Sequence, residues 1–139
     1  MGNSIKFIMV DDDYIYLNLL RKQLERAGVH HCINHFSTAG DFLTYFCENQ
    51  DRTEISSALL ILDLHLPFMS GIDLLAQLQC MPELANTGLS TIVNTTSSNP
   101  DDRSKCQELG CMMYHVKTPD NKELICAIKS HLQQHVLLS

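Results

Sequence analysis

The sequence predicts an α/β protein in which helices pack on both faces of a parallel sheet. Five short apolar segments alternate with five segments whose apolar residues recur at helical spacing, which is the pattern of repeated strand–helix units. The apolar segments are nearly continuous rather than alternating, as expected for strands that are covered on both sides. They comprise residues 5–10, 32–36, 58–62, 90–94 and 112–116.

The first half of the chain supplies two strand–helix units and the central strand. After the first strand, apolar residues at helical spacing over 16–27 predict a helix, and Gly28 is suited to end it. After the second strand, Thr38 begins a capping pattern that precedes another apolar helical face. The polar segment 48–57 predicts a loop, and the strongly apolar run 58–62 predicts the central strand.

The second half supplies three further helices. Gly71 is expected to open the first of them, and Pro82 to end it. Residues 99–102 read Asn-Pro-Asp-Asp, which combines a capping residue, a proline suited to the first turn and two acids at the positive end of the helix dipole. Gly110 is suited to end this helix, and residues 118–120 predict the start of the last one.

Composition limits the classes of protein to consider. A chain of 139 residues with 45% hydrophobic residues is expected to form one domain over 1–139, with its core between about 5 and 132. The net charge of −6 argues against a nucleic-acid surface. No segment resembles a signal peptide or is long and apolar enough to span a bilayer, so we expect a cytoplasmic protein without membrane contact.

Six cysteines are present, but they contain no CxxC pair and none has a histidine at zinc-finger spacing. They are therefore interpreted as buried or incidental reduced thiols.

Polar residues end four of the five predicted strands. Asp11 and Asp12 follow the first strand, Asp63 the third, and Lys117 the fifth, while Thr95 ends the fourth. Ligands of such sheets bind at the carboxyl ends of the strands, where these groups would meet. Carboxylates can hold a hard divalent cation and one can act as nucleophile, whereas the hydroxyl and ammonium groups can bind phosphoryl oxygens. Together the residues predict an aspartyl phosphorylation site.

Each of these residues taken alone has a plainer interpretation. The acidic run 11–13 could be a solvated turn that caps the first helix, Thr95 an ordinary strand residue, and Lys117 a surface lysine. Asp63 is harder to explain in this way, because a single acid that leaves a buried strand needs a partner or a cation.

Four segments carry a resemblance to a known family. They read FIMVDDD at 7–13, LILDLHLP at 60–67 with MSG at 69–71, TTSS at 95–98 and YHVK at 114–117. In this combination the chain resembles bacterial two-component response regulators, specifically the receiver domain, from about residue 5 to about 132. The resemblance implies a flavodoxin-like, doubly wound sheet of five parallel strands in the order 2-1-3-4-5, with five helices. It also implies a stand-alone regulator of the chemotaxis type, with no output domain.

The resemblance assigns a nucleophile and a metal shell. It makes Asp63 the phosphoacceptor and Asp12 a direct ligand of Mg²⁺, with Asp11 acting through water. The backbone carbonyl of His65 would complete the protein's share of the ligands.

The resemblance also assigns the residues around the phosphoryl group. Thr95 and Lys117 would bind its oxygens. Tyr114, which by itself would be taken for a core residue, resembles the aromatic switch that turns inward when the Thr95 hydroxyl moves toward the phosphoryl group.

In function, the resemblance implies a protein that takes a phosphoryl group from a sensor histidine kinase and switches a protein-binding surface. The alternative is a phosphorelay intermediate that passes the group to a histidine phosphotransfer protein. Either protein would catalyse only its own Mg²⁺-dependent phosphorylation and dephosphorylation. Its output would be a downstream protein target, with phosphorylation-dependent dimerisation as a further form of output.

One departure from the family pattern affects the predicted site. Thr118 follows Lys117 where the family usually has proline. Because a cis bond before a residue other than proline costs about 2.5–4 kcal/mol, the Lys117–Thr118 bond is predicted to be trans. Thr118 is then expected to cap the last helix, with Pro119 in its first turn and the Lys117 ammonium still reaching the acidic pocket.

Two other classes of protein with related sheets fit less well. A flavodoxin-type FMN carrier would need a hydroxyl- or glycine-rich phosphate cradle after the first strand, where this chain has three acids. A haloacid-dehalogenase-type phosphatase would need a second acid two residues after the nucleophile, where this chain has His65.

Overall fold

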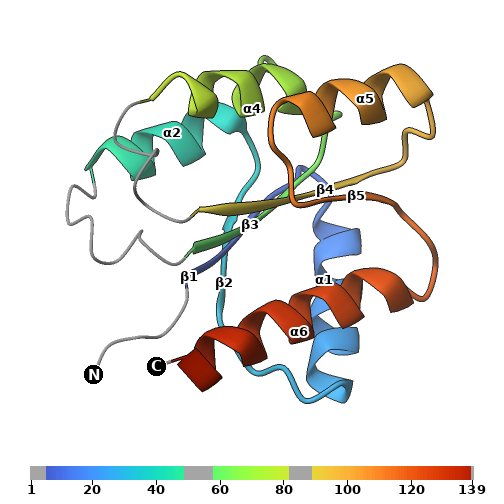
Figure 1. Ribbon diagram of the computed structural model, residues 1–139. Coiled ribbons are helices and arrows are strands. Elements are labelled where there is room, and N and C mark those ends of the chain that lie inside the picture. The colour runs from blue at the N-terminus through green and yellow to red at the C-terminus, as the bar shows by residue number, and fades with distance from the viewer. Residues whose placement is uncertain (1–5, 49–57, 82–88, 139) are drawn as a thin grey trace.

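Five parallel strands form one sheet whose neighbours follow the order β2-β1-β3-β4-β5 (Figure 1). The computed structural model describes residues 6–48, 58–81 and 89–138, with side chains as far as residue 133 in the last helix. The strands are β1 Lys6–Val10, β2 Ile33–Phe36, β3 Ala58–Leu62, β4 Ser90–Thr95 and β5 Met113–Val116. The predicted doubly wound, flavodoxin-like fold is confirmed. Ile5, residues 49–57 of the predicted loop 48–57, and the predicted helix stop at Pro82 lie outside the described residues, while Glu48 is the last residue of a helix rather than part of a loop.

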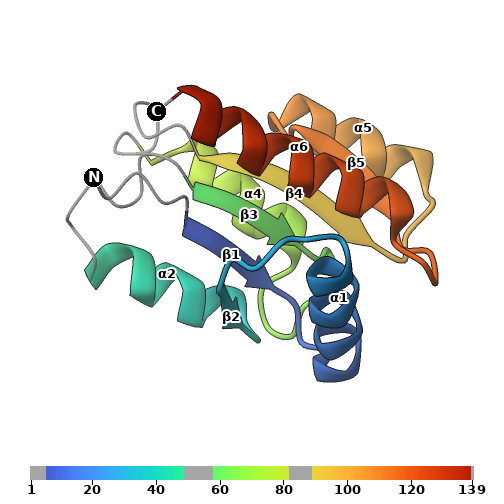
Figure 2. The same cartoon turned by 90° about the horizontal axis from the view of Figure 1, so that it is seen from below.

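The described parts of the chain contain five helices, which cover the sheet in two layers (Figures 1 and 2). One face is covered by α1 and α6, and the other by α2, α4 and α5. Among them, none is both long and apolar enough to cross a membrane. The bounds are α1 Tyr14–Arg26, α2 Ala39–Glu48, α4 Gly71–Gln79, α5 Pro100–Glu108 and α6 Lys122–Leu138.

The central strand β3 separates two hydrophobic cores. Its side chains alternate between them: Leu59 and Ile61 join the core under α1 and α6, whereas Leu60 and Leu62 join the core under α2, α4 and α5. Every residue of β3 is fully buried, as predicted for 58–62. Asp63 directly follows the carboxyl end of this buried strand.

The helix starts follow local hydrogen-bonding rules. The Asn99 side chain accepts a hydrogen bond of 2.9 Å from Asp101 N–H, and Pro100 opens α5, as predicted. Asp13 caps α1 by accepting a 3.0 Å bond from Tyr16 N–H. Thus one residue of the acidic run 11–13 does serve as a helix cap, and the other two remain available to a site.

The start of the last helix differs from the prediction. Thr118 does not cap it: its hydroxyl accepts a 3.1 Å bond from Asn121 N–H, which closes a local turn, and α6 begins at Lys122. Asn121 has a φ of 50°, a left-handed conformation that asparagine tolerates but that interrupts a helix. The helix therefore starts beyond Asn121, with Asp120 accepting a 3.1 Å bond from Lys122 N–H. The Lys117–Thr118 bond is trans, as predicted.

Gly71 opens α4 directly against the end of β3. A Cβ atom at this position would lie 2.2 Å from the carbonyl oxygen of Asp63 and 2.7 Å from the Cα of Leu64. The Gly71 N–H also donates a 3.0 Å bond to the Leu64 carbonyl. Because Gly71 has no side chain, the first turn of α4 can pack directly against the loop that follows Asp63.

We expect Gly71→Ala to lower the free energy of unfolding by about 1–3 kcal/mol, because the added methyl group has to displace backbone rather than a side chain. Urea denaturation followed by circular dichroism measures this change. Gly40→Ala is the matched control: Gly40 is exposed in α2, where a Cβ meets nothing nearer than 4.0 Å. Alanine there should be neutral or stabilise by up to about 1 kcal/mol. Equal effects of the two substitutions would contradict the close-contact argument.

Candidate functional site

Three carboxylates meet at the carboxyl edge of the sheet. Asp11 and Asp12 follow β1 and Asp63 follows β3, and oxygens of all three lie within 4.8 Å of one another. Asp11 and Asp63 are only 1% and 6% exposed, whereas Asp12 is exposed to solvent. The structure therefore brings together the three acids that the sequence singled out, and the exposed one gives the cluster access to water.

Lys117 joins this cluster from the end of β5. Its Nζ atom donates to Asp11 Oδ2 at 2.9 Å and to Asp63 Oδ2 at 3.4 Å. Its backbone N–H donates a 2.7 Å bond to the Thr95 carbonyl, which fixes the residue beside the end of β4. The ammonium group thus reaches the acidic pocket with a trans peptide bond after it, as expected.

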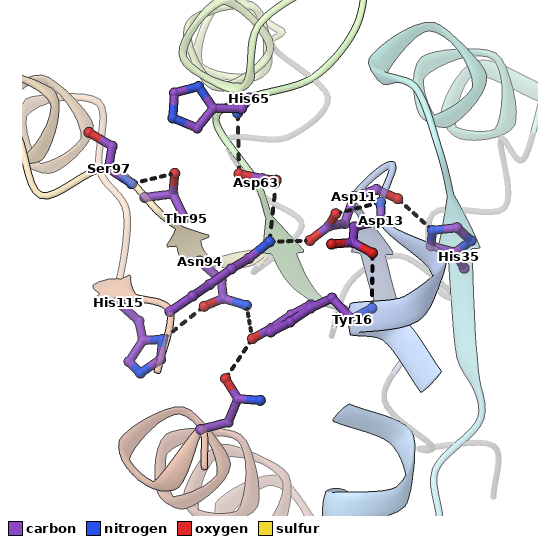
Figure 3. Close-up of polar contacts among 12 residues, drawn as sticks. Asp11, Asp13, Tyr16, His35, Asp63, His65, Asn94, Thr95, Ser97 and His115 are labelled. Carbon is purple, nitrogen blue, oxygen red and sulfur yellow. Dashed lines mark hydrogen bonds and ion pairs between the residues drawn. The ribbon is translucent and has the colours of Figure 1, made fainter. Parts of the chain in front are cut away.

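Asp11 is the most constrained of the three acids (Figure 3). Its Oδ1 accepts a 2.9 Å bond from Asp13 N–H while its Oδ2 accepts from Lys117. Its backbone carbonyl accepts a 2.6 Å bond from His35 Nε2. Because a carbonyl oxygen can only accept, the hydrogen of this bond is on Nε2. Burial raises the pKa of Asp11, even though the Lys117 and Asp13 hydrogen bonds act in the opposite direction.

The same surroundings also shift the pKa of Lys117. Burial acts to lower its pKa, but the hydrogen bond and charge of Asp11, together with the charge of Asp63, outweigh burial and raise it. The lysine is therefore held in its charged form between two buried carboxylates.

Asp63 is held more loosely than Asp11. Its Oδ1 accepts a 3.2 Å bond from His65 N–H, and its nearest contact with Lys117 is 3.4 Å (Figure 3). The His65 side chain is exposed. The role of the His65 carbonyl as a metal ligand stays a prediction.

Thr95 and Tyr114 are linked through the backbone of one residue, Ser97. Thr95 is fully buried at the end of β4, and its Oγ1 accepts a 3.2 Å bond from Ser97 N–H. The Tyr114 hydroxyl donates a 2.9 Å bond to the carbonyl of the same Ser97. The Tyr114 ring is 7% exposed and packs with the core under α4 and α5, with the Arg103 guanidinium 5.1 Å from the ring centroid.

A polar network beneath Lys117 was not predicted. The Lys117 ammonium lies 4.2 Å from the centroid of the Tyr16 ring. The Tyr16 hydroxyl donates to Asn121 Oδ1 at 2.6 Å and accepts from Asn94 Nδ2 at 2.8 Å. Asn94 Oδ1 in turn accepts a 2.8 Å bond from His115 Nδ1. The one signal available in the sequence was the presence of Asn94 beside the apolar residues of β4 and of His115 within β5.

The family model of the response regulator receiver domain matches residues 7–129. The chain belongs to this family. As a receiver domain it is a signalling module of a two-component system rather than a conventional enzyme. Receiver domains bind Mg²⁺ in an acidic pocket, and in this chain Asp11, Asp12 and Asp63 form an acidic cluster that could hold a metal ion. Membership in this family argues against the alternatives of an FMN carrier and a phosphatase.

Individual relatives agree with this assignment over nearly the whole chain. Sporulation initiation phosphotransferase F of Bacillus subtilis (strain 168) is 25% identical over 127 residues, which cover 91% of this chain and 93% of that protein. A receiver domain from Rhodospirillum rubrum is 28% identical, with a TM-score of 0.75 and coverage of 95% and 94% of the two chains. A CheY-like receiver protein from Methanospirillum hungatei JF-1 is 25% identical, with a TM-score of 0.70 and coverage of 98% and 100%.

We expect Lys117→Met to lower the free energy of unfolding by about 1–3 kcal/mol at pH 7, because it leaves the buried Asp11 carboxylate without its counter-charge. A carboxyl group whose folded pKa is raised opposes folding above its ordinary pKa of 3.8, and this cost vanishes as the pH falls toward that value. Loss of Lys117 raises the pKa of Asp11 further. The stability gap between parent and variant should therefore be largest at pH 7 and shrink toward pH 4.

Denaturant titrations of both proteins at several pH values measure this gap. Lys105→Met, which changes an exposed lysine of α5, is the control and should show a small difference that does not vary with pH. A gap for Lys117→Met that is constant from pH 4 to pH 7 would contradict the ion-pair argument.

Proposed function

We propose that this receiver accepts a phosphoryl group on Asp63 from the phosphohistidine of a sensor kinase. The observation that supports this most is the convergence of three carboxylates within 4.8 Å, with one lysine bonded to two of them. In the transfer, an Asp63 carboxylate oxygen forms a bond to phosphorus as the phosphorus–nitrogen bond of the phosphohistidine breaks. The histidine nitrogen leaves with the electron pair of that bond.

Asp63 is the best placed of the three acids to act as nucleophile. Both oxygens of Asp11 are engaged at 2.9 Å, whereas the partners of Asp63 lie at 3.2 and 3.4 Å. A more weakly held oxygen needs less reorganisation to attack. Asp12 is exposed and remains available as a ligand that faces solvent.

The donor set fits a hard divalent cation. Three carboxylates from two strand ends suit Mg²⁺, which prefers oxygen ligands and keeps several waters. In this proposal Asp12 and Asp63 bind the cation directly, Asp11 acts through water, and the His65 carbonyl completes the set. When bound, the cation would supply positive charge where the carboxylate and the phosphoryl oxygens otherwise repel each other. Lys117, bonded to Asp11 and Asp63, would add a second positive charge.

We expect incubation with Mg²⁺ and a small phosphodonor such as acetyl phosphate to give an acid-stable, base-labile adduct on Asp63. Asp63→Asn should lose at least about nine tenths of the label, because the amide is a far weaker nucleophile. Asp73→Asn, an exposed aspartate of α4, should be labelled as well as the parent. Mass spectrometry of proteolytic fragments locates the adduct, and undiminished labelling of Asp63→Asn would overturn the assignment.

We propose that phosphorylation acts on the surface formed by α5 and β5 through Ser97. A Thr95 hydroxyl drawn toward the phosphoryl group gives up its 3.2 Å bond with Ser97 N–H, and the Ser97 carbonyl is the acceptor for Tyr114. Because Tyr114 is already buried here, the change is a shift between two packings rather than a new burial of the ring. The partner that binds the changed surface would be a downstream protein or a second copy of the receiver.

A relay role is the second candidate, and exposed residues of α1 offer a docking surface that this role shares with the first. Ile15 is 84% and Leu19 42% exposed, one helical turn apart, and α1 begins immediately after the acidic run. Apolar side chains beside the pocket suit a protein that brings a histidine to Asp63. The relative from Bacillus subtilis is named as a phosphotransferase, in keeping with transfer to and from such a protein.

We expect Ile15→Lys to slow phosphotransfer from a purified phosphorylated histidine kinase or histidine phosphotransfer protein by about tenfold, which corresponds to loss of one apolar contact at an interface. Labelling by acetyl phosphate should stay within about twofold of the parent, since it needs no docking. Comparing the rates of phosphotransfer from a histidine kinase and from a histidine phosphotransfer protein also distinguishes a terminal regulator from a relay intermediate. Equal slowing with acetyl phosphate would show that the substitution damages the pocket instead.

A further inference from the structure

We propose that Tyr16 is a positioning residue for Lys117, and that its aromatic face holds the ammonium group where it meets the phosphoryl oxygens. This inference rests on the proposed phosphorylation of Asp63. It adds a residue of α1 to a site whose other side chains come from strand ends and the loops that follow them. The observation behind it is the stacking of the Lys117 Nζ atom 4.2 Å from the Tyr16 ring centroid.

The carboxylates alone leave the position of the lysine underdetermined. Its four-carbon stem has many rotamers, and its two carboxylate partners, Asp11 and Asp63, attract it at unequal distances of 2.9 and 3.4 Å. The aromatic ring adds a third contact, and the lysine side chain is left only 11% exposed. A cation within 6 Å of an aromatic face is attracted to the negative face of the ring, and more strongly where water is excluded.

The ring is itself fixed by groups from three other parts of the fold. Its hydroxyl accepts from Asn94 of β4 (Figure 3). The same hydroxyl donates to Asn121, just before α6. Asn94 is tied to His115 of β5, and Asn121 Nδ2 donates a 2.7 Å bond to Gln23 of α1. Both hydrogen-bonding capacities of the hydroxyl are used, as donor and as acceptor, so the plane of the ring is set before any phosphoryl group arrives.

This geometry suits the movement that phosphorylation requires. Lys117 lies nearer to Asp11 than to Asp63, so its ammonium has to shift toward Asp63 when phosphoryl oxygens appear there. A hydrogen bond would resist such a shift because it depends on direction. An aromatic face attracts a cation over a broad area, so Tyr16 can keep contact with the ammonium as it moves.

The test compares two substitutions that separate the ring from the hydroxyl. Tyr16→Leu removes the ring and should slow labelling of Asp63 by acetyl phosphate by about three- to tenfold. Tyr16→Phe keeps the ring and should stay within about threefold of the parent. Tyr14→Leu is the control: Tyr14 also lies in α1 but is 59% exposed and packs on His35 instead. It should label at the parental rate.

Two further measurements distinguish positioning from a general loss of structure. Mg²⁺ affinity, measured by titration calorimetry, should be unchanged in Tyr16→Leu because Tyr16 contributes no ligand. In proton NMR spectra, the Lys117 Hε signals should lie upfield in the parent and in Tyr16→Phe through the ring current, and should move to ordinary positions in Tyr16→Leu. A loss of Mg²⁺ affinity, or Lys117 signals that do not respond to the ring, would overturn the proposal.

A double-mutant cycle and a graded series complete the test. In a Lys117→Met background, replacement of Tyr16 by leucine should no longer change the labelling rate. If Tyr16→Leu does not fold, phenylalanines of increasing fluorine content at position 16 preserve the shape while weakening the negative face, and the rate should fall along the series. A flat series, or an undiminished effect of Tyr16→Leu in the Lys117→Met background, would overturn the inference.

If the parent itself acquires no label on Asp63, the proposed function fails and this inference with it. A labelled parent with an equally labelled Tyr16→Leu overturns only this inference.

Discussion

The ammonium group of Lys117 offsets the charge of two carboxylates that the fold buries. Asp11 and Asp63 directly follow neighbouring strands whose residues, apart from the half-buried Lys6, are fully or almost fully removed from water. Their side chains therefore emerge close together with little solvent to screen them. Buried like charges raise each other's free energy unless a cation is nearby. Lys117 provides that cation from the far edge of the sheet, and its backbone bond to Thr95 ties it to β4. The order of the strands and the chemistry of the site are therefore inseparable.

The strands, their parallel arrangement and the residues at their ends could be predicted from the sequence, because each depends on a local pattern of residues. Continuous apolar runs marked the buried strands, and the glycine and asparagine signals at Gly28, Asn99 and Gly110 marked helix ends, where the two glycines have φ values of 87° and 88°. The strand order came from family resemblance rather than from periodicity. Convergence of Asp11, Asp12 and Asp63 then followed from topology, since parallel strands present their carboxyl ends on one edge.

Features that depend on contacts between distant segments could not be predicted. Tyr16 and Asn121 are 105 residues apart, and no local pattern indicates that their side chains meet. The start of the last helix was misplaced for the same reason. Thr118 and Pro119 formed a plausible cap, but Asn121 is buried and bonded to Tyr16 and Gln23, and its left-handed backbone delays the helix to Lys122. A tertiary contact thus outweighed a local signal.

The Asn94–His115 bond has a consequence for how the edge of the sheet assembles. The two residues are direct partners across β4 and β5, and burial lowers the pKa of His115, which favours the neutral imidazole that can share one proton with an amide oxygen. β5 is an edge strand of only four residues, and such strands are prone to pair with their neighbour in the wrong register. A shift by one residue would carry His115 to the opposite, apolar face and leave Asn94 Oδ1 unpaired. This buried polar pair therefore disfavours misaligned pairing of β5 and favours the alignment that places Lys117 beside the acids.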